Sequence, residues 1–110
     1  MEFSDLITRL PLADVPFPAV DGYMARAPEG LVVFFHFKEE TVVPPHSHGA
    51  QWGAVLAGEV TLTKSGETQV RRPGQSYTIA NGEIHSARVA AGTRLVEVFE
   101  EPDRYTPRQS

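Results

Sequence analysis

Short apolar stretches separated by glycine turns fill most of this sequence, and they constrain the fold more than any other feature. The stretches are rich in β-branched and aromatic residues, which favour extended chain, and helix-period patterns are absent after residue 11. Such a succession predicts an all-β sandwich or barrel. The expected turns fall at Gly58-Glu59, Ser65-Gly66-Glu67, Pro73-Gly74, Asn81-Gly82 and Ala91-Gly92.

The two ends of the chain differ from this middle part. Residues 4–10 predict one or two helical turns that begin after Ser4 as N-cap and end before Pro11. The prolines of "PLADVPFPAV" then predict extended chain, so residues 1–19 are expected to form an N-terminal arm. Residues 101–110 are polar and are expected to form a C-terminal tail that frays, which leaves residues 20–100 as the folded domain.

The composition limits the classes of partner. The chain has 110 residues, enough for one domain, and a hydrophobic fraction of 41% can supply its core. A formal net charge of -4 with no basic block predicts no nucleic-acid partner and no membrane partner. Because there is no cysteine, disulfides and thiol nucleophiles are excluded, and we expect a reducing, cytoplasmic location.

Four polar residues form a candidate metal site. His46 and His48 stand two apart, and because side chains alternate along a strand, both imidazoles can reach one metal ion. Gln51 can join them if the chain bends at Gly49-Ala50. His85 follows a turn and would supply a third imidazole if its strand lies beside the first. Imidazoles suit zinc, iron, nickel, copper and manganese alike.

The segments around these residues, "HSHGAQWGAVLAGE" and "GQSYTIANGEIH", resemble the two motifs of the cupin family. The resemblance covers most of residues 20–100 and implies a single antiparallel β-barrel, or jelly roll. It also implies one divalent metal ion (Zn, Ni, Mn or Fe) in the barrel mouth. The motif positions are His46, His48, Gln51 and Gly58 in the first segment and Gly74, Ala80, Gly82 and His85 in the second, so that the expected ligands are His46, His48, Gln51 and His85.

The chain departs from the cupin pattern where Gln51 replaces the glutamate of the first motif. A ligand set of three imidazoles and an amide is neutral, so the metal would be held less tightly and would be a stronger Lewis acid. Ala80 stands where the second motif has proline, and it changes the turn more than the chemistry. The alternative is a remnant barrel that no longer binds metal.

Three residues outside the metal site are candidate catalytic residues. Glu97 lies in the middle of the apolar stretch "RLVEVF", which fits an acid/base role near a metal or a salt bridge at an edge strand or dimer contact. Tyr77 either lines the pocket or fills the barrel. The chain is also similar to the small cupins that linearise unsaturated uronate sugars, and this similarity implies matching roles for Glu97, Phe99 and Arg104 in "EVFEEPDR".

Three functions compete. The first is a metal-dependent enzyme of the Lewis-acid isomerase or lyase type, acting on a small polar substrate such as a sugar acid. The second is an iron-dependent dioxygenase, and the third is a non-catalytic protein that binds a small molecule or a metal. The family resemblance also implies a homodimer, in which Phe17 and Val20 of the arm would lie across the partner.

Overall fold

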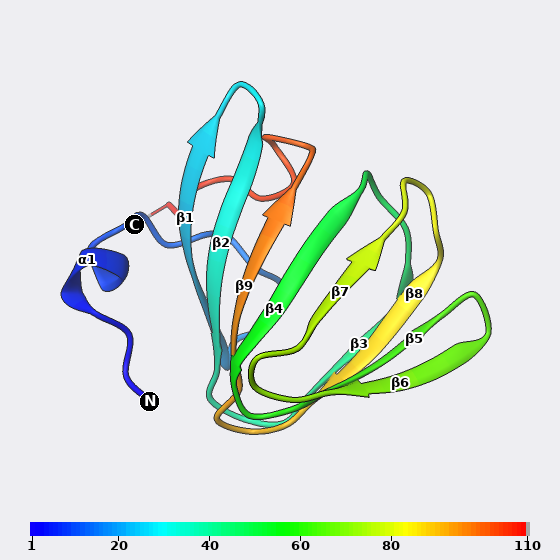
Figure 1. The fold of residues 1–110 in the computed structure, drawn as a ribbon. Helices are drawn as coiled ribbons and strands as arrows, with labels where there is room; N and C mark the ends of the chain where they lie inside the picture. The colour runs from blue at the N-terminus through cyan, green and yellow to red at the C-terminus, as the bar shows by residue number, and fades with distance from the viewer. Residues whose placement is uncertain (110) are drawn as a thin grey trace.

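The computed structural model describes residues 1–109, and its strands between Val20 and Phe99 pair into two antiparallel sheets (Figure 1). The first sheet has the order β1-β2-β9-β4-β7 and the second the order β3-β8-β5-β6. The strands are β1 (Val20–Ala27), β2 (Gly30–Phe37), β3 (Thr41–His46), β4 (Gln51–Ala57), β5 (Val60–Lys64), β6 (Glu67–Arg71), β7 (Ser76–Ile79), β8 (His85–Val89) and β9 (Arg94–Phe99).

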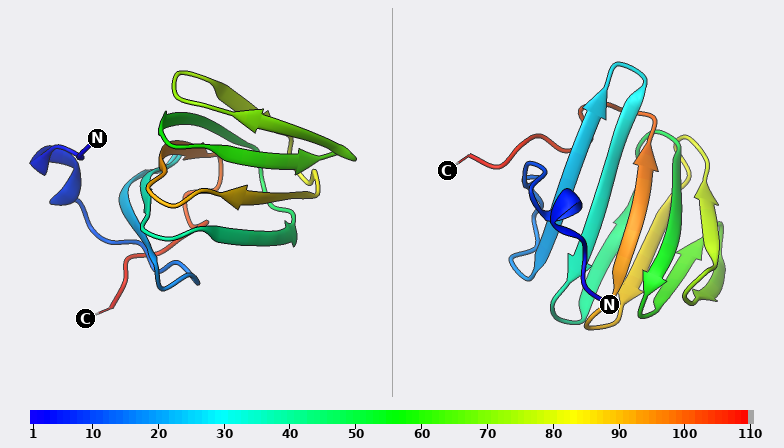
Figure 2. Two further views of the ribbon diagram at one scale, coloured as in Figure 1. Left: turned by 90° about the horizontal axis from the view of Figure 1, so that it is seen from below. Right: turned by 60° about the vertical axis from the view of Figure 1, so that its left-hand side comes forward.

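The two sheets face each other (Figure 2), and the buried residues of the core lie between their inner faces. Burial alternates along β2, where Leu31, Val33, Phe35 and Phe37 are buried and the residues between them are half-buried. This alternation is what a strand with one face toward a core requires. The expected all-β jelly roll is confirmed.

The glycine turns have a backbone that other residues avoid. All five have a φ between +76° and +87°, in the left-handed region that costs glycine little because it has no Cβ. Each of these glycines lies between two consecutive strands, where the chain turns. They are Gly58, Gly66, Gly74, Gly82 and Gly92.

The N-terminal helix is present as expected but short. Helix α1 (Asp5–Thr8) begins after Ser4, whose hydroxyl accepts a hydrogen bond of 3.1 Å from the amide of Leu6. The helix lies outside the barrel (Figure 2), and nearby Phe3 packs edge-on against Tyr23 and Phe34. Within residues 1–109, no helix has the length and apolar character needed to cross a bilayer.

The segments on either side of the barrel pack against it and against each other. Leu12 and Ala13 form bridges to Tyr23 and Pro107, and the amide of Arg108 donates to the carbonyl of Leu12 at 2.6 Å. The tail therefore does not fray over residues 105–108. The physical reason is Tyr105, an aromatic side chain that packs edge-on against Phe35 and Phe99.

Phe17 and Val20, which were expected to contact a partner subunit, pack inside their own chain. Phe17 is half-buried and packs against the core of its own chain, and Val20 is buried at 1% exposure. The N-terminal segment thus contacts its own barrel at Ala13 and Phe17, and Phe17 and Val20 offer no support for a dimer.

Candidate metal centre

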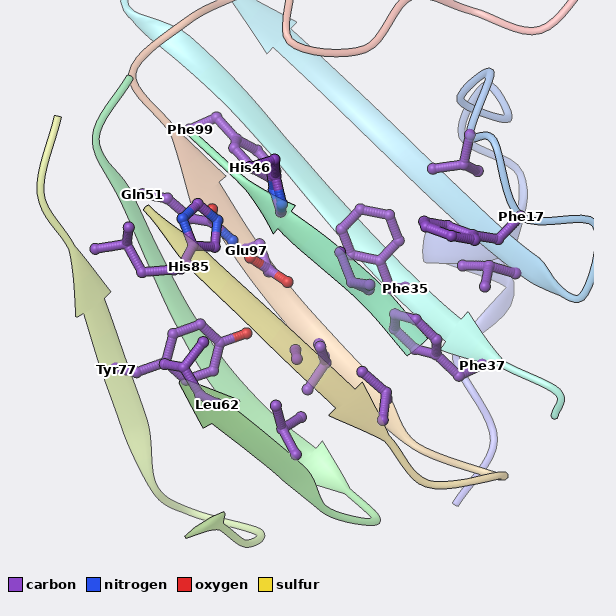
Figure 3. A pocket seen from close by; sticks show the side chains of 18 of the residues that line it. Phe17, Phe35, Phe37, His46, Gln51, Leu62, Tyr77, His85, Glu97 and Phe99 are labelled. Carbon is purple, nitrogen blue, oxygen red and sulfur yellow. The ribbon is translucent and has the colours of Figure 1, made fainter. Parts of the chain in front are cut away.

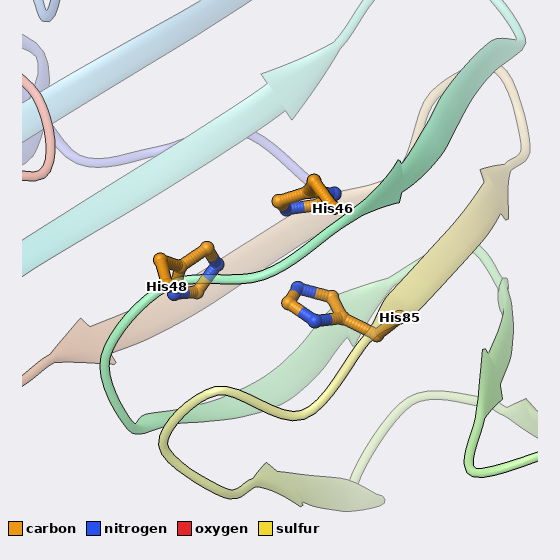
Figure 4. A group of neighbouring side chains, drawn as sticks. All are labelled: His46, His48 and His85. Carbon is orange, nitrogen blue, oxygen red and sulfur yellow. The ribbon is translucent and has the colours of Figure 1, made fainter.

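Strand pairing brings the three expected imidazoles together. β3 and β8 are antiparallel neighbours, and His46 lies directly opposite His85 in their register. His48 follows β3, and the three rings converge (Figure 4). One nitrogen from each ring lies within 4.8 Å of the others, so His46, His48 and His85 could hold one metal ion.

Each imidazole is fixed by a backbone carbonyl through its Nδ1 atom. The partners are the carbonyls of Pro44, Gly49 and Glu83, at 2.9, 2.8 and 2.9 Å from His46, His48 and His85 in turn. Because a carbonyl oxygen only accepts, each Nδ1 carries the hydrogen and each Nε2 keeps a free lone pair. This arrangement orients metal-binding histidines and fixes their tautomer.

The surroundings favour neutral rings. Burial lowers the pKa of His48 and of His85 below the ordinary value of 6.5, and the positive charge of Arg104 acts in the same direction. Only a neutral imidazole can bind a metal, so both rings are available at neutral pH.

Two carboxylates hold the bend between His48 and Gln51. Glu101 accepts a hydrogen bond of 2.6 Å from the amide of Gly49, and Glu100 accepts one of 2.9 Å from the amide of Ala50. A Cβ on Gly49 would lie 2.8 Å from the Glu101 side chain, so a larger residue here would displace the carboxylates that hold the bend. Sequence reasoning missed both carboxylates, because only the tertiary fold brings the end of β9 to this loop.

Gln51 fits the site as a further ligand. Its side chain is buried, it lines the same cavity as the histidines, and its Oε1 atom has no hydrogen-bond partner. A buried carbonyl oxygen without a partner is costly, and a metal ion is one group that would satisfy it. Trp52, the next residue, points outward with 42% of its surface exposed, as alternation along β4 predicts.

Glu97 and Tyr77 form a buried pair inside the cavity. Gly53 on β4 lies opposite Tyr77 on β7 and opposite Glu97 on β9, so these three residues form one row across the sheet. A side chain at Gly53 would overlap the ring and hydroxyl of Tyr77. The bare glycine lets the Tyr77 hydroxyl reach over the middle strand and donate a hydrogen bond to Glu97.

Burial dominates the acid–base properties of this pair. It raises the pKa of Glu97 to about 7, although the hydrogen bond from Tyr77 and the charge of Arg104 act against the rise. Burial and the neighbouring carboxylate raise the pKa of Tyr77 well above 10. Glu97 can therefore both take up and release a proton near neutral pH.

Arg104 lies close to this site but does not line the cavity. Its guanidinium stacks over Tyr105 at 4.8 Å from the ring centre, and its Nε atom is buried without a partner. Its charge is near enough to influence the pKa values of Glu97 and two of the histidines. The structure thus brings all seven expected residues into one region, with Arg104 at its margin.

A substitution at Gly53 should separate the buried pair. In Gly53→Ala, the added methyl group overlaps the Tyr77 ring, so we expect Tyr77 to move away from Glu97 and the barrel to lose about 2 kcal/mol of stability. Urea denaturation measures the loss, and the tyrosine absorption spectrum reports the change around Tyr77. A variant as stable as the wild type, with an unchanged spectrum, would contradict the close approach.

The fold and the site together define a class: a small antiparallel β-barrel protein with three buried or half-buried histidines that could hold one metal ion. The chain belongs to the cupin family, because residues 33–99 match the model of the cupin domain. No curated protein matched the sequence.

Several solved structures share the fold. An RmlC-like cupin from Shewanella frigidimarina NCIMB 400 is 22% identical, with 94% of each chain covered and a TM-score of 0.78. KdgF from Halomonas sp. is 20% identical over 89% of this chain and 87% of that chain, with a TM-score of 0.70. A salicylate 1,2-dioxygenase from Pseudaminobacter salicylatoxidans is 14% identical over 81% of this chain but only 28% of that chain, with a TM-score of 0.70. Identities this low establish the shared fold and leave the activity open.

Proposed function

We propose that this cupin is a metal-dependent enzyme of the Lewis-acid isomerase or lyase type. Its substrate is a small polar molecule, such as a sugar acid or another small carboxylate with a neighbouring oxygen. One observation carries the proposal: the histidines and a buried, protonatable glutamate line the same cavity. In the sequence, Glu97, Phe99 and Arg104 also match the segment of the uronate-linearising cupins.

The metal would be held by the Nε2 atoms of His46, His48 and His85 and by the Oε1 atom of Gln51. When bound, such an ion polarises a substrate oxygen and makes the neighbouring carbon or hydroxyl more acidic. Zinc, nickel, manganese and iron all suit this neutral donor set, so the identity of the metal stays open.

Three side chains of the protein would then transfer a proton, orient the transferring group and attract the substrate. Glu97 would exchange a proton with the substrate, because a pKa of about 7 matches neutral conditions. Tyr77 would orient the carboxylate of Glu97 through their hydrogen bond. The positive charge of Arg104, at the margin of the site, would favour an anionic substrate.

The experiment that tests this function combines turnover with oxygen uptake. The protein, loaded in turn with manganese, iron, nickel or zinc, is offered small sugar acids and 2-oxo acids, with products followed by nuclear magnetic resonance. We expect turnover without oxygen uptake, reduced by about 10²–10⁴-fold in Glu97→Gln with the metal retained. Exposed Glu29→Gln is the matched control and should behave as the wild type.

Two outcomes would replace the proposal by an alternative. Oxygen consumption by the iron-loaded protein in step with substrate loss would identify a dioxygenase. Ligand binding without turnover under any metal would identify a non-catalytic binder.

We also propose a homodimer formed through the outer face of the larger sheet. Trp52 and Val98 are cross-strand partners on this face, with exposures of 42% and 40%, so they leave apolar surface open to water. Light scattering at micromolar concentration should give the mass of a dimer, and Trp52→Lys should shift it toward that of a monomer. A monomeric wild type would refute this assembly.

A further inference from the structure

The cavity of the barrel is divided into a polar end and an apolar end. Gln51, His85 and Glu97 lie at one end, whereas Phe17, Phe35 and Phe37 lie at the other (Figure 3). Between the ends, the wall is completed mainly by aliphatic side chains of both sheets, such as Val60, Leu62 and Leu95. A ligand in this cavity therefore meets most of the polar side chains of the wall at one end.

Few polar atoms of the wall are free to bind a ligand. The Nδ1 atoms of the histidines are bound to carbonyls, and Tyr77 is bound to Glu97. The backbone groups of the central lining strands are used by the sheets. The free atoms at the polar end are the histidine Nε2 atoms and two unpartnered buried oxygens, Gln51 Oε1 and Glu97 Oε2. The one further lining residue with a polar side-chain atom is Tyr105, which packs against Phe35 and Phe99.

The cavity, which includes the space at the metal centre, is small. The cavity has a volume of about 70 Å³, whereas an apolar protein cavity that binds benzene has about 150 Å³. A body of three or four carbons fits this space better than a ring.

We propose that, within the proposed function, the substrate is a small carboxylate with an adjacent oxygen and a short branched aliphatic body, and is not a polyhydroxylated sugar acid. The head would bind at the metal centre, where the ion and Arg104 supply positive charge, and the aliphatic body would lie against Phe35 and Phe37. A sugar acid would place its hydroxyl groups against this apolar wall. Each hydroxyl left there without a partner should weaken binding about tenfold or more.

The test compares two small carboxylates that each carry an oxygen next to the carboxylate and differ in the rest of the molecule. Isothermal titration of the zinc-loaded protein with 3-methyl-2-oxobutanoate and with 2-ketogluconate measures the two dissociation constants. Because 2-ketogluconate closes to a cyclic hemiketal and has no free 2-oxo group, the affinity of each ligand for free zinc is measured in a separate titration and corrected for. We expect 3-methyl-2-oxobutanoate to bind at least about 100-fold more tightly, because several hydroxyls of 2-ketogluconate would lose their hydrogen bonds.

Two matched variants locate the aliphatic body. Ala87 on β8 lines the cavity, and Ala54 on β4 lies between the inward-facing Gly53 and Val55 and is not part of the wall. Ala87→Leu should weaken the binding of 3-methyl-2-oxobutanoate at least about tenfold by filling the space, while zinc content stays at one per chain. Ala54→Leu should leave both unchanged.

The outcomes separate this inference from the function on which it rests. A wild-type protein that holds zinc but binds 2-ketogluconate as tightly as 3-methyl-2-oxobutanoate overturns the inference alone. An Ala87→Leu variant that is folded, holds zinc and binds as the wild type does overturns the placement of the aliphatic body. A wild-type protein that retains none of manganese, iron, nickel and zinc overturns the proposed function and the inference with it. If it retains one of the other three metals but not zinc, the same titrations are made with that metal.

Discussion

Replacing His48 by alanine should abolish stoichiometric metal binding while the barrel stays folded. His48 supplies one of three imidazole nitrogens that lie within 4.8 Å of one another, and a site that loses one of these donors holds a divalent ion far more weakly. Loss of a residue that only supports a ligand already costs 10–100-fold in affinity, so loss of the ligand itself should cost more than about 100-fold. Elemental analysis after gel filtration with manganese, iron, nickel and zinc in turn measures the effect.

Two further variants make this result specific. His36→Ala is the matched control, because His36 lies on β2, outside the cluster, and should leave the metal content unchanged. Gln51→Glu should act in the opposite direction to His48→Ala and tighten binding, because it adds a negative charge to a neutral ligand set. If the wild-type protein retains none of the four metals at neutral pH, the remnant-barrel alternative replaces the metal site.

Replacing Glu97 by glutamine should remove a pH-dependent loss of stability. Burial raises the pKa of Glu97 in the folded protein from the ordinary 4.5 to about 7, so the folded state binds this proton more tightly than the unfolded state does. The resulting stability is fully present below pH 4.5 and is lost as the pH rises through 7. The difference between the two pKa values corresponds to about 3 kcal/mol.

The side-chain amide introduced by Glu97→Gln carries no charge at any of these pH values, so the variant should not show this loss. The free energy of unfolding of Glu97→Gln, relative to the wild type, should therefore rise by about 3 kcal/mol between about pH 4 and about pH 9. Urea denaturation in the presence of a chelator measures it without a contribution from bound metal. Glu67→Gln on exposed β6 is the control, and a relative stability of Glu97→Gln that does not change with pH would show that Glu97 is not buried as a neutral acid.

The sequence analysis identified the residues of the histidine cluster but placed two residues of the cavity wall elsewhere. Tyr105 was assigned to a fraying tail and Phe17 to a dimer contact, but both line the cavity of their own chain. An isolated aromatic residue in a polar segment was the one signal in the sequence that could have indicated docking for Tyr105. Its partners, Phe35 and Phe99, are distant in the chain, so no local pattern could identify them.

The sequence by itself determined the strands, the turns and which side chains along each strand point inward or outward. These features depend on neighbours within a few residues: alternation sends Gln51 inward and Trp52 outward, and Gly58 permits a positive φ. For the same reason, the pairing of His46 with His48 on one segment could be predicted from their spacing.

Only the tertiary structure decided how these strands combine into a site. The register of β3 on β8 places His85 opposite His46, and the row from β7 through β4 to β9 lets Tyr77 reach Glu97 over Gly53. Burial between the two sheets then raises the pKa of Glu97 and leaves the Gln51 oxygen without a partner. These properties arise from contacts between segments far apart in the chain, whose pairing is fixed by the packing of the whole core and not by any single stretch of sequence.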